Sequence, residues 1–348
     1  MNRGTGRPFA PPSLARSLEI LEALPGARVT VVGDAVLDLF EIGEIARVSR
    51  EAPVLILEHR ETALAPGGAA NTAANLAALG VRTSLVGRAG DDEHGRMLRD
   101  LLADLGVDVA PLVREPGWPT PAKTRILAGS PHTAKQQVVR IDRGRRDAPA
   151  GTRVLRKVEA AARRARRRGD GIVLADYGYG LVAPSLVSAL GPGPGPLTLD
   201  SRFQLAAFRG IDAATPNLEE LERAAGRRLE DDDLAGIAAA GRDLRRRLEA
   251  AALLVTRGSR GMTLLEKGRP PVHVPVFGSD EIADVTGAGD TVIATFTAAR
   301  TAGATWLEAA WLANVAGGLV VMKRGTATVS REEIATALEE FHREEGLP

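Results

Sequence analysis

The sequence has no cysteine in 348 residues, and this absence removes several classes of chemistry. Disulfide scaffolds, thiolate nucleophiles, thiolate zinc sites and iron–sulfur clusters all require cysteine. The five histidines are too widely scattered for a zinc motif. Aromatic residues make up only 3% of the chain, so a platform for stacked bases is not expected. With 45 Lys and Arg against 44 Asp and Glu, the chain also lacks the global basic field that attracts nucleic acid or anionic membranes.

Long apolar segments of the kind that span membranes are not expected either. The apolar run from Ala309 to Met322 is shorter than the roughly 20 residues of a membrane helix and contains two glycines. The first residues contain Pro and Gly but no continuous apolar region, so residues 1–20 are expected to be a flexible tail before a single domain at 21–348. We therefore expect a cytoplasmic protein with neither a membrane nor a nucleic acid as partner.

Apolar, β-branched runs alternate with helical patterns, which is typical of an α/β fold with a mostly parallel sheet covered by helices on both faces. The expected strands are residues 27–34, 83–87, 171–176, 197–200 and 252–256. The expected helices are residues 69–79, 94–105, 152–168, 217–225, 233–250, 290–302 and 306–322. Residues 40–60 and 122–142 carry strand-like segments without helices between them, so they predict a small β flap. Ligands in open α/β sheets bind beyond the carboxyl ends of the strands, where Asp34, Asp176, Asp200 and Thr256 are expected.

Two common nucleotide motifs, GxxxxGK[ST] and a GxGxxG between a strand and a helix, are missing. A different glycine-rich turn, DVTGAGDT at 284–291, precedes an apolar helical stretch. Backbone N–H groups of the small residues Gly287, Ala288 and Gly289 can converge on a phosphate at the positive end of this helix. A carboxylate beside such an anion hole would repel phosphate unless it had a chemical task. Asp290 is therefore interpreted as a base for an attacking hydroxyl, and an Asp helix cap is the alternative.

Two motifs in this order carry a family resemblance. DVTGAGDT resembles the C-terminal signature of the ribokinase-like (PfkB) carbohydrate kinases, and PGGAAN at 66–71 resembles their N-terminal signature. The similarity runs from about Arg28 to Ile334. More narrowly, the segments VVGDAVLDLFEIGEIARVSREAPV, AKTRIL, QQVVRID, VLADYGYG and TPNLEELE resemble the kinase domain of bifunctional heptose kinase/adenylyltransferases. No HxGH nucleotidyltransferase motif occurs, so the chain resembles a stand-alone kinase.

The resemblance implies a ribokinase-like fold in which the flap is a lid over the sugar. It also implies ATP-dependent phosphorylation of the anomeric hydroxyl of D-glycero-D-manno-heptose 7-phosphate, which gives the 1,7-bisphosphate. Two positions depart from the narrower pattern: Tyr179 stands where Lys is usual, and Asp200-Ser-Arg202 replaces Asp-Pro-Lys. They leave the sugar open, so a kinase for ribose, fructose or a hexose phosphate is one alternative. A catalytically silent nucleotide- or sugar-binding protein is the other.

The resemblance also assigns ligand-binding residues. The sugar would contact Asp34, Asp38, Gly67, Gly68 and Asn71. ATP would contact Asn217, Leu218, Glu219, Glu220, Thr256, Gly258, Gly261, Asn314 and Gly317. Mg²⁺ would be held by Glu220 and Asn217, largely through water, with Asp176 as a further candidate ligand. A monovalent cation is a further candidate cofactor. The alternatives are a strand-end cap for Asp34, a plain turn for the two glycines and first-turn acids favoured by the helix dipole for Glu219 and Glu220.

The flap contributes a prediction of its own. Lys123 and Arg125 alternate on one expected strand and so share a face, and Arg140 lies on the next strand. These three cations are expected to converge on the phosphate of the sugar, with solvated strand charges as the alternative. Flap strands would also leave unpaired edges in a monomer, so we expect a homodimer that pairs them across a two-fold axis.

Overall fold

The computed structural model describes residues 9–130, 135–146, 149–278, 283–323 and 325–346. Its centre is a nine-stranded sheet in the order β13-β12-β11-β10-β9-β8-β1-β4-β5. The parallel strands are β1 (Arg28–Gly33), β4 (Arg82–Gly90), β5 (Leu112–Glu115), β8 (Gly171–Asp176), β9 (Leu197–Ser201), β10 (Ala213–Ala214) and β11 (Ala252–Thr256). An antiparallel hairpin of β12 (Met262–Glu266) and β13 (Val272–Val274) completes one edge. The predicted mostly parallel sheet is confirmed.

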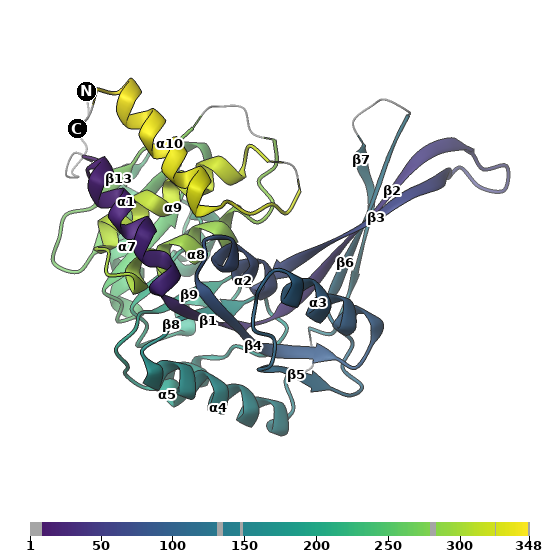
Figure 1. Ribbon diagram of the computed structural model, residues 1–348, viewed down its shortest axis with the longest axis horizontal. Coiled ribbons are helices and arrows are strands. Elements are labelled where there is room, and N and C mark those ends of the chain that lie inside the picture. The colour runs from purple at the N-terminus through teal and green to yellow at the C-terminus, as the bar shows by residue number, and fades with distance from the viewer. Residues whose placement is uncertain (1–8, 131–134, 147–148, 279–282, 324, 347–348) are drawn as a thin grey trace.

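Both faces of the central strands are buried because alternate side chains enter two different cores. On β8, Val173 and Ala175 belong to one apolar cluster, whereas Ile172 and Leu174 belong to the other. The first core lies under α1 (Leu14–Ala23), α2 (Ala69–Ala78), α3 (Glu93–Asp104), α8 (Ala288–Thr301), α9 (Trp306–Val320) and α10 (Arg331–Glu344) (Figure 1). The second lies under α4 (Thr152–Arg168), α5 (Pro184–Leu190), α6 (Leu218–Ala225) and α7 (Leu234–Arg247).

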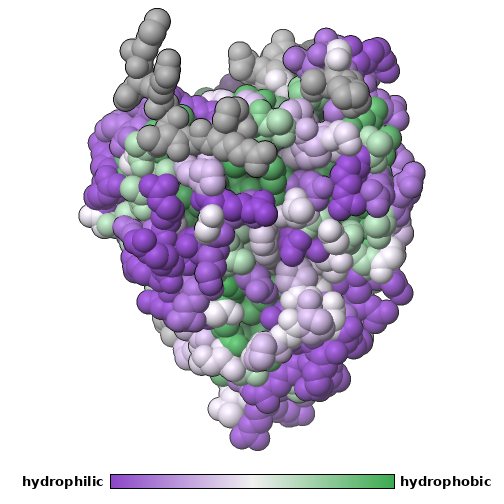
Figure 2. All heavy atoms as spheres, turned by 90° about the vertical axis from the view of Figure 1, so that its left-hand side faces the viewer, coloured by the Kyte–Doolittle hydropathy of each residue, from purple (hydrophilic) through white to green (hydrophobic). Residues whose placement is uncertain are grey.

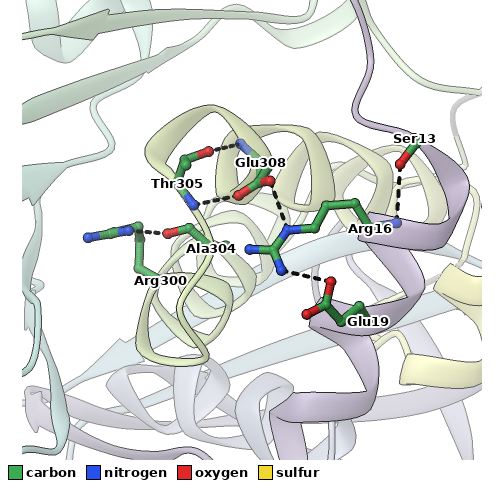
Figure 3. Close-up of polar contacts among 7 residues, drawn as sticks. All are labelled: Ser13, Arg16, Glu19, Arg300, Ala304, Thr305 and Glu308. Atoms are coloured by element: carbon green, nitrogen blue, oxygen red, sulfur yellow. Dashed lines mark hydrogen bonds and ion pairs between the residues drawn. The ribbon is translucent and has the colours of Figure 1, made fainter.

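The N-terminal segment corrects the predicted tail of residues 1–20. Residues 1–8 lie outside the described part, but Leu14–Ala23 form helix α1, which buries Ile20 and Leu21. Arg16 of α1 donates to Glu308 in the first turn of α9, and Glu308 exchanges capping bonds with Thr305 (Figure 3). This helix therefore packs on the main body of the fold, because its apolar side chains and the Arg16–Glu308 hydrogen bond both attach it.

The flap is a separate four-stranded sheet in the order β3-β2-β6-β7. It consists of β2 (Ala35–Val48), β3 (Leu55–Gly68), β6 (Ala122–Gly129) and β7 (Gln136–Arg143), while residues 131–134 between β6 and β7 lie outside the described part. β2 begins at the main sheet and β3 returns to it, so this part of the flap extends beyond the predicted residues 40–60 at both ends. The flap therefore projects from the body as an arm (Figure 1). The face turned away from the flap is mostly hydrophilic, with apolar areas between charged side chains (Figure 2).

This architecture brings the expected polar residues to one edge of the sheet. Asp34, Asp176, Asp200 and Thr256 end or follow parallel strands, and the first turn of α8 lies at the same edge. The site is therefore bounded by strand ends below, α8 on one side and the root of the flap on another.

No helix in the described ranges is long and apolar enough to cross a membrane.

Candidate active site

Asp290 is buried at the start of α8, and its carboxylate contacts other parts of the fold. The side-chain amide of Asn71 donates to Oδ2 at 2.7 Å, and the Thr72 hydroxyl donates to Oδ1 at 3.3 Å. The phenol of Tyr177 also donates to Oδ1. Gly287 is the N-cap residue of α8, and no side chain caps this helix end. Asp290 therefore does not cap its helix, and α2 and the loop after β8 hold it instead.

Two opposing effects set the protonation of Asp290. Burial raises the pKa of its carboxyl group above the usual range. Hydrogen bonds from Tyr177 and Asn71, the charge of Arg202 and the hydroxyl of Thr72 act in the other direction. A carboxylate that is buried yet supplied with donors has the proton affinity and the fixed orientation that a general base requires.

The residues predicted to form an anion hole lie at the start of α8, and the N–H group of one of them is already bonded. The N–H of Ala288 donates to the carbonyl of Val285 at 3.3 Å, so it is already used. Within the described ranges, nothing accepts from the N–H groups of Gly289 and Asp290, which belong to the first helical turn. Gly287 has a φ of 82°, and a Cβ there would lie 2.6 Å from Nδ2 of Asn71. Only glycine can therefore make this turn and leave Asn71 in contact with Asp290.

A cavity of about 660 Å³ opens in front of Asp290. Its wall includes most of the residues predicted for the phosphates and metal, namely Asn217, Leu218, Glu219, Glu220, Thr256, Gly258, Gly287 and Gly289. Asp200, Arg202 and Tyr177 also line it. Asp176 does not, because its oxygens accept from the N–H of Gly178 and the hydroxyl of Ser201 beneath the surface. The acid from the strand ends that reaches the cavity is thus Asp200.

Asn217 and Glu220 form a reciprocal capping box at the start of α6. Asn217 Oδ1 accepts from the N–H of Glu220 at 2.8 Å, and Glu220 Oε2 accepts from the N–H of Asn217 at 3.0 Å. Both residues therefore have a structural role at the start of the helix. The other carboxylate oxygen of Glu220, Oε1, takes no part in the capping box. Glu219 is exposed and pairs with Arg223 at 2.8 Å.

The acids around the cavity provide a test of whether a divalent cation suits it. Burial raises the pKa of Asp200 well above its usual value, and the charges of Glu220 and Asp290 raise it further. Burial likewise raises the pKa of Glu220. A cation between Asp200 and Glu220 would relieve this repulsion. Among the residues that the structure describes, no three His, Asp or Glu side chains form a ready metal cluster, so the donor set suits a Mg²⁺ that retains waters and phosphate oxygens.

A second, largely apolar cavity of about 390 Å³ adjoins the first. Thr256, Gly258, Val285 and Gly289 line both, so the two form one continuous cleft. The predicted residues Asn314, Gly317 and Gly261 line this part, together with Met262, Val276, Phe277, Ala288 and Val292. Asn314 donates to the carbonyl of Pro275 at 2.8 Å, and a Cβ on Gly261 would lie 2.2 Å from the carbonyl oxygen of Val274. A polar cleft with an apolar end suits a nucleotide, whose phosphates and base differ in the same way.

The predicted sugar residues lie at the root of the flap. Asp34 Oδ2 accepts from the N–H groups of Tyr177 and Tyr179, both at 3.0 Å. Asp34 Oδ1 is buried and has no hydrogen-bond partner within the described part of the chain. A Cβ on Gly67 would lie 2.9 Å from Asp38 Oδ2, and Gly68 has a φ of 57°. The strand-end cap and a free acceptor thus coexist on Asp34, one on each oxygen.

Asn71, which the resemblance assigns to the sugar, contacts the candidate base Asp290. Its Nδ2 donates to Asp290, and its Oδ1 accepts from Asn75 at 3.2 Å. Both ends of the amide are therefore used inside the protein, and the residue holds the candidate base.

Asp34 should make stability depend on pH. Burial raises its pKa from 3.8 to about 6, which outweighs the backbone donors. Because the pKa of Asp34 is higher in the folded state, its contribution to the free energy of unfolding is fully present below the unfolded-state pKa of 3.8 and is lost as pH rises through about 6. Above pH 6 this loss amounts to about 3 kcal/mol. We expect Asp34→Asn to increase the urea-unfolding free energy at pH 8 and to change it by less than about 1 kcal/mol at pH 4. An equal change at both pH values would contradict this assignment.

The three predicted flap cations share one face of the flap. Arg125 lies opposite Arg140, and Lys123 lies opposite Asp142 on β7 and beside Asp38 on β2. Arg125 pairs with Asp38 at 2.8 Å, and the more exposed Arg140 pairs with Asp142 at 2.8 Å. Burial lowers the pKa of Lys123; the charge of Asp38 opposes this, whereas Arg202 and Arg125 lower it further. Lys123, Arg125 and Arg202 are together called the cation cluster, because the charges of Arg125 and Arg202 both act on Lys123, against the opposing charges of Asp38 and Asp142.

Sequence reasoning missed the contribution of Tyr177 to the site. This residue directly follows Asp176 at the end of β8, and its ring lies against Gly68 while its hydroxyl reaches Asp290. Its position directly after a strand end could have indicated this role, but the role was assigned to the preceding residue, Asp176. Thr72 was missed for a similar reason, since it lies one residue beyond the recognised motif.

Comparison with known proteins gives consistent results for this chain. A family model described as pfkB family carbohydrate kinase matches residues 27–152 and 196–333. The Bifunctional protein HldE of Nitrosococcus oceani is 42% identical over 315 residues, which are 90% of this chain and 64% of that protein. The protein of the same name from Chromohalobacter salexigens is 41% identical over 322 residues, which are 91% of this chain and 65% of that protein. The chain thus spans somewhat less than two thirds of these relatives.

Solved structures support the fold. Ribokinase of Arabidopsis thaliana, complexed with ribose and ATP, superposes with a TM-score of 0.68 at 22% identity, covering 90% of this chain and 99% of that one. Phosphofructokinase-2 of Escherichia coli, in complex with substrates and products, superposes with a TM-score of 0.73 at 20% identity, with the same two coverages. The predicted ribokinase-like architecture is therefore confirmed.

Proposed function

This chain belongs to the pfkB family of carbohydrate kinases and is a sugar kinase, and from that premise we propose that its acceptor is a sugar phosphate. The proposed reaction transfers the terminal phosphoryl group of ATP to the anomeric hydroxyl of D-glycero-D-manno-heptose 7-phosphate, in the cytoplasm. The product is the 1,7-bisphosphate. The heptose is proposed because of the similarity to the HldE proteins, of which this chain spans about 64% to 65%.

The observation that carries the sugar-phosphate proposal is the cation cluster. Lys123 and Arg125 lie on β6 of the flap, and Arg202, directly after β9, is close enough for its charge to act on Lys123. These three cations exceed by one the two carboxylates that act on Lys123, Asp38 and Asp142, so net positive charge remains. A phosphate dianion would restore the balance and would allow Lys123 to stay protonated at low cost. A neutral sugar would supply neither effect.

The residues of the cleft have a division of work in this proposal. Asp34 accepts a sugar hydroxyl through Oδ1, and Asp290 accepts the proton of the attacking anomeric hydroxyl. The free N–H groups of Gly289 and Asp290 stabilise the phosphoryl group in transfer. The apolar cavity beside Gly317 holds the base of ATP. Asp200 and Glu220 would hold Mg²⁺, which would supply positive charge to the phosphates of the nucleotide.

The proposed substrate can be tested by comparing acceptors in one assay. ADP formation should be measured with heptose 7-phosphate, fructose 6-phosphate, ribose and fructose at equal concentration. We expect kcat/KM for heptose 7-phosphate to exceed that for each unphosphorylated sugar by at least about 100-fold, because contacts between the phosphate and the cation cluster are lost without the phosphate. A preference for a free sugar would refute the proposal.

Exchanging K⁺ for a large organic cation in the same assay tests the monovalent-cation requirement.

We also propose that the chain forms a homodimer through the flap. β3 and β7 are the unpaired edges of its sheet, and the tip and outer strand expose Ile45, Val48, Val54, Leu55, Val138, Val139 and Ile141. Exposed apolar strand edges favour pairing with another copy. Light scattering at micromolar concentration should give twice the chain mass of 36.6 kDa, and Val139→Lys should reduce it to one chain. A monomer mass for the unmodified protein would refute the dimer.

A further inference from the structure

Tyr177 contacts both Asp34, the candidate sugar ligand, and Asp290, the candidate base. Its backbone N–H donates to Asp34 Oδ2 at 3.0 Å, and its phenol donates to Asp290 Oδ1. The same hydroxyl lies 3.5 Å from Asp200 Oδ2. Burial raises the pKa of this phenol well above its usual value, and the charges of Asp290 and Asp200 raise it further. Tyr177 therefore donates a hydrogen bond to Asp290, with Asp200 as the second neighbour of its hydroxyl.

The two oxygens of Asp290 are not equivalent in their hydrogen bonds. Oδ1 accepts from both Tyr177 and Thr72, whereas Oδ2, among the residues that the structure describes, accepts only from Asn71. A carboxylate oxygen offers about two lone-pair positions, so Oδ1 is filled and Oδ2 keeps one position open. This asymmetry depends chiefly on the phenol, since the Thr72 contact is the longest of the three at 3.3 Å.

We infer that Tyr177 is a positioning residue that fills Oδ1 of Asp290, keeps the carboxylate ionised and thereby directs the proton of the acceptor hydroxyl to Oδ2. This inference rests on the proposed role of Asp290 as the base. The proton moves from the sugar hydroxyl to Oδ2 as the new oxygen–phosphorus bond forms. The bond between that phosphorus and the bridging oxygen of ATP breaks, ADP leaves with its electron pair, and Tyr177 keeps its own proton throughout. No other group needs to gain or lose a proton in this step.

The surroundings define what removal of the phenol should do. The charged and titratable groups that act on Asp290 or its phenol partner are Arg202, Asp200 and, through Asp200, Glu220. Arg202 stabilises the ionised form, and its guanidinium lies 5.3 Å from the centre of the Tyr177 ring. Without the phenol, Asn71, Thr72 and Arg202 remain as stabilising groups, and the burial of the carboxylate is unchanged. The ionised form of Asp290 therefore becomes costlier but does not lose all support.

Tyr177→Phe tests this inference because it removes only the hydroxyl. We expect the acid limb of the kcat–pH profile to move up by about one to two pH units, as loss of a hydrogen bond to a charged group implies. At a fixed pH on that limb this would lower kcat by about 10- to 100-fold, with recovery at higher pH and an unchanged KM for ATP. Tyr179→Phe is the matched control, since Tyr179 belongs to the same turn but its ring stacks with Arg146 instead.

The chain contains only two tyrosines, which provides a readout that does not need activity. In Tyr179→Phe, labelling tyrosine with ¹³C at Cζ gives a single resonance from Tyr177. We expect this resonance to show a pH step as Asp290 is titrated, and the step should vanish when Asp290→Asn is added. Thermal unfolding of each variant verifies that the comparison is made on folded protein.

The outcomes separate the inference from the proposed function. An unmoved pH profile in Tyr177→Phe, or a resonance unaffected by Asp290→Asn, would overturn the positioning role even if Asp290→Asn is inactive. Full activity of Asp290→Asn would instead refute the base itself, whatever the resonance does. A shifted profile together with a step that depends on Asp290 supports the inference, because a merely structural tyrosine would produce neither.

Discussion

Replacing Asp290 by Asn is expected to lower kcat by about 10³- to 10⁴-fold, near the upper end of what a general base contributes. The amide has nearly the shape of the carboxylate and can still contact Asn71 or Tyr177, but it cannot take a proton from the acceptor hydroxyl. The KM for ATP should change little, since the cavities that receive the nucleotide are formed mainly by other residues. Steady-state ADP release with saturating sugar phosphate is the measurement.

A second acid of the same turn provides the control for this experiment. Asp284 is the other carboxylate of the DVTGAGDT motif, and it accepts from the N–H groups of Thr286 and Gly325. Asp284→Asn removes the same charge from the same loop without touching Asp290, and kcat should stay within a few-fold of the unmodified enzyme. Because burial raises the pKa of Asp290, its replacement by a neutral side chain should not destabilise the fold. Equal losses in both variants would mean that the loop's net charge matters and that Asp290 is not the base.

The fold could be predicted to a large extent because its signals are local. The strands at β1, β8 and β11 are short apolar runs that end in polar residues, and this pattern alone places their ends at one edge of a parallel sheet. The motif around Gly287 likewise specifies a helix start from its sequence. Helix α1 escaped prediction because its apolar stripe is short and follows a Pro- and Gly-containing stretch, and only packing on the body reveals it.

The site could be predicted only where one segment carries the chemistry. Contacts between segments decided the rest: Asn71 and Tyr177 meet Asp290 across 219 and 113 positions of sequence. Nothing in one sequence indicates which of two acids at neighbouring strand ends reaches the cavity. Asp176 turns inward to Ser201, while Asp200 lines the wall, because the loop after β8 folds back over its own strand. Periodicity supplies no information on that choice.

Lys123→Met is expected to raise the KM for a sugar phosphate by about 10- to 100-fold, which is the effect of losing one charged hydrogen bond. Met keeps the unbranched stem that packs at the flap root but provides no charge. The KM for ATP should stay within about two-fold, because Lys123 is not among the residues that line either cavity of the nucleotide cleft. Initial rates with both substrates varied will separate the two constants.

Lys123 is the most informative member of the cation cluster because each of the others has a second task. Removing Arg125 would leave Asp38 without its ion-pair partner, so fold and affinity would change together. Arg202 also acts on Asp200 and Asp290, which would alter turnover. Arg140→Ala, at an exposed position paired with Asp142, should raise the KM by only a few-fold. If Lys123→Met and Arg140→Ala have equal effects, or if a free sugar suffers as much as its phosphate, the cluster does not bind the phosphate and the acceptor must be sought among neutral sugars.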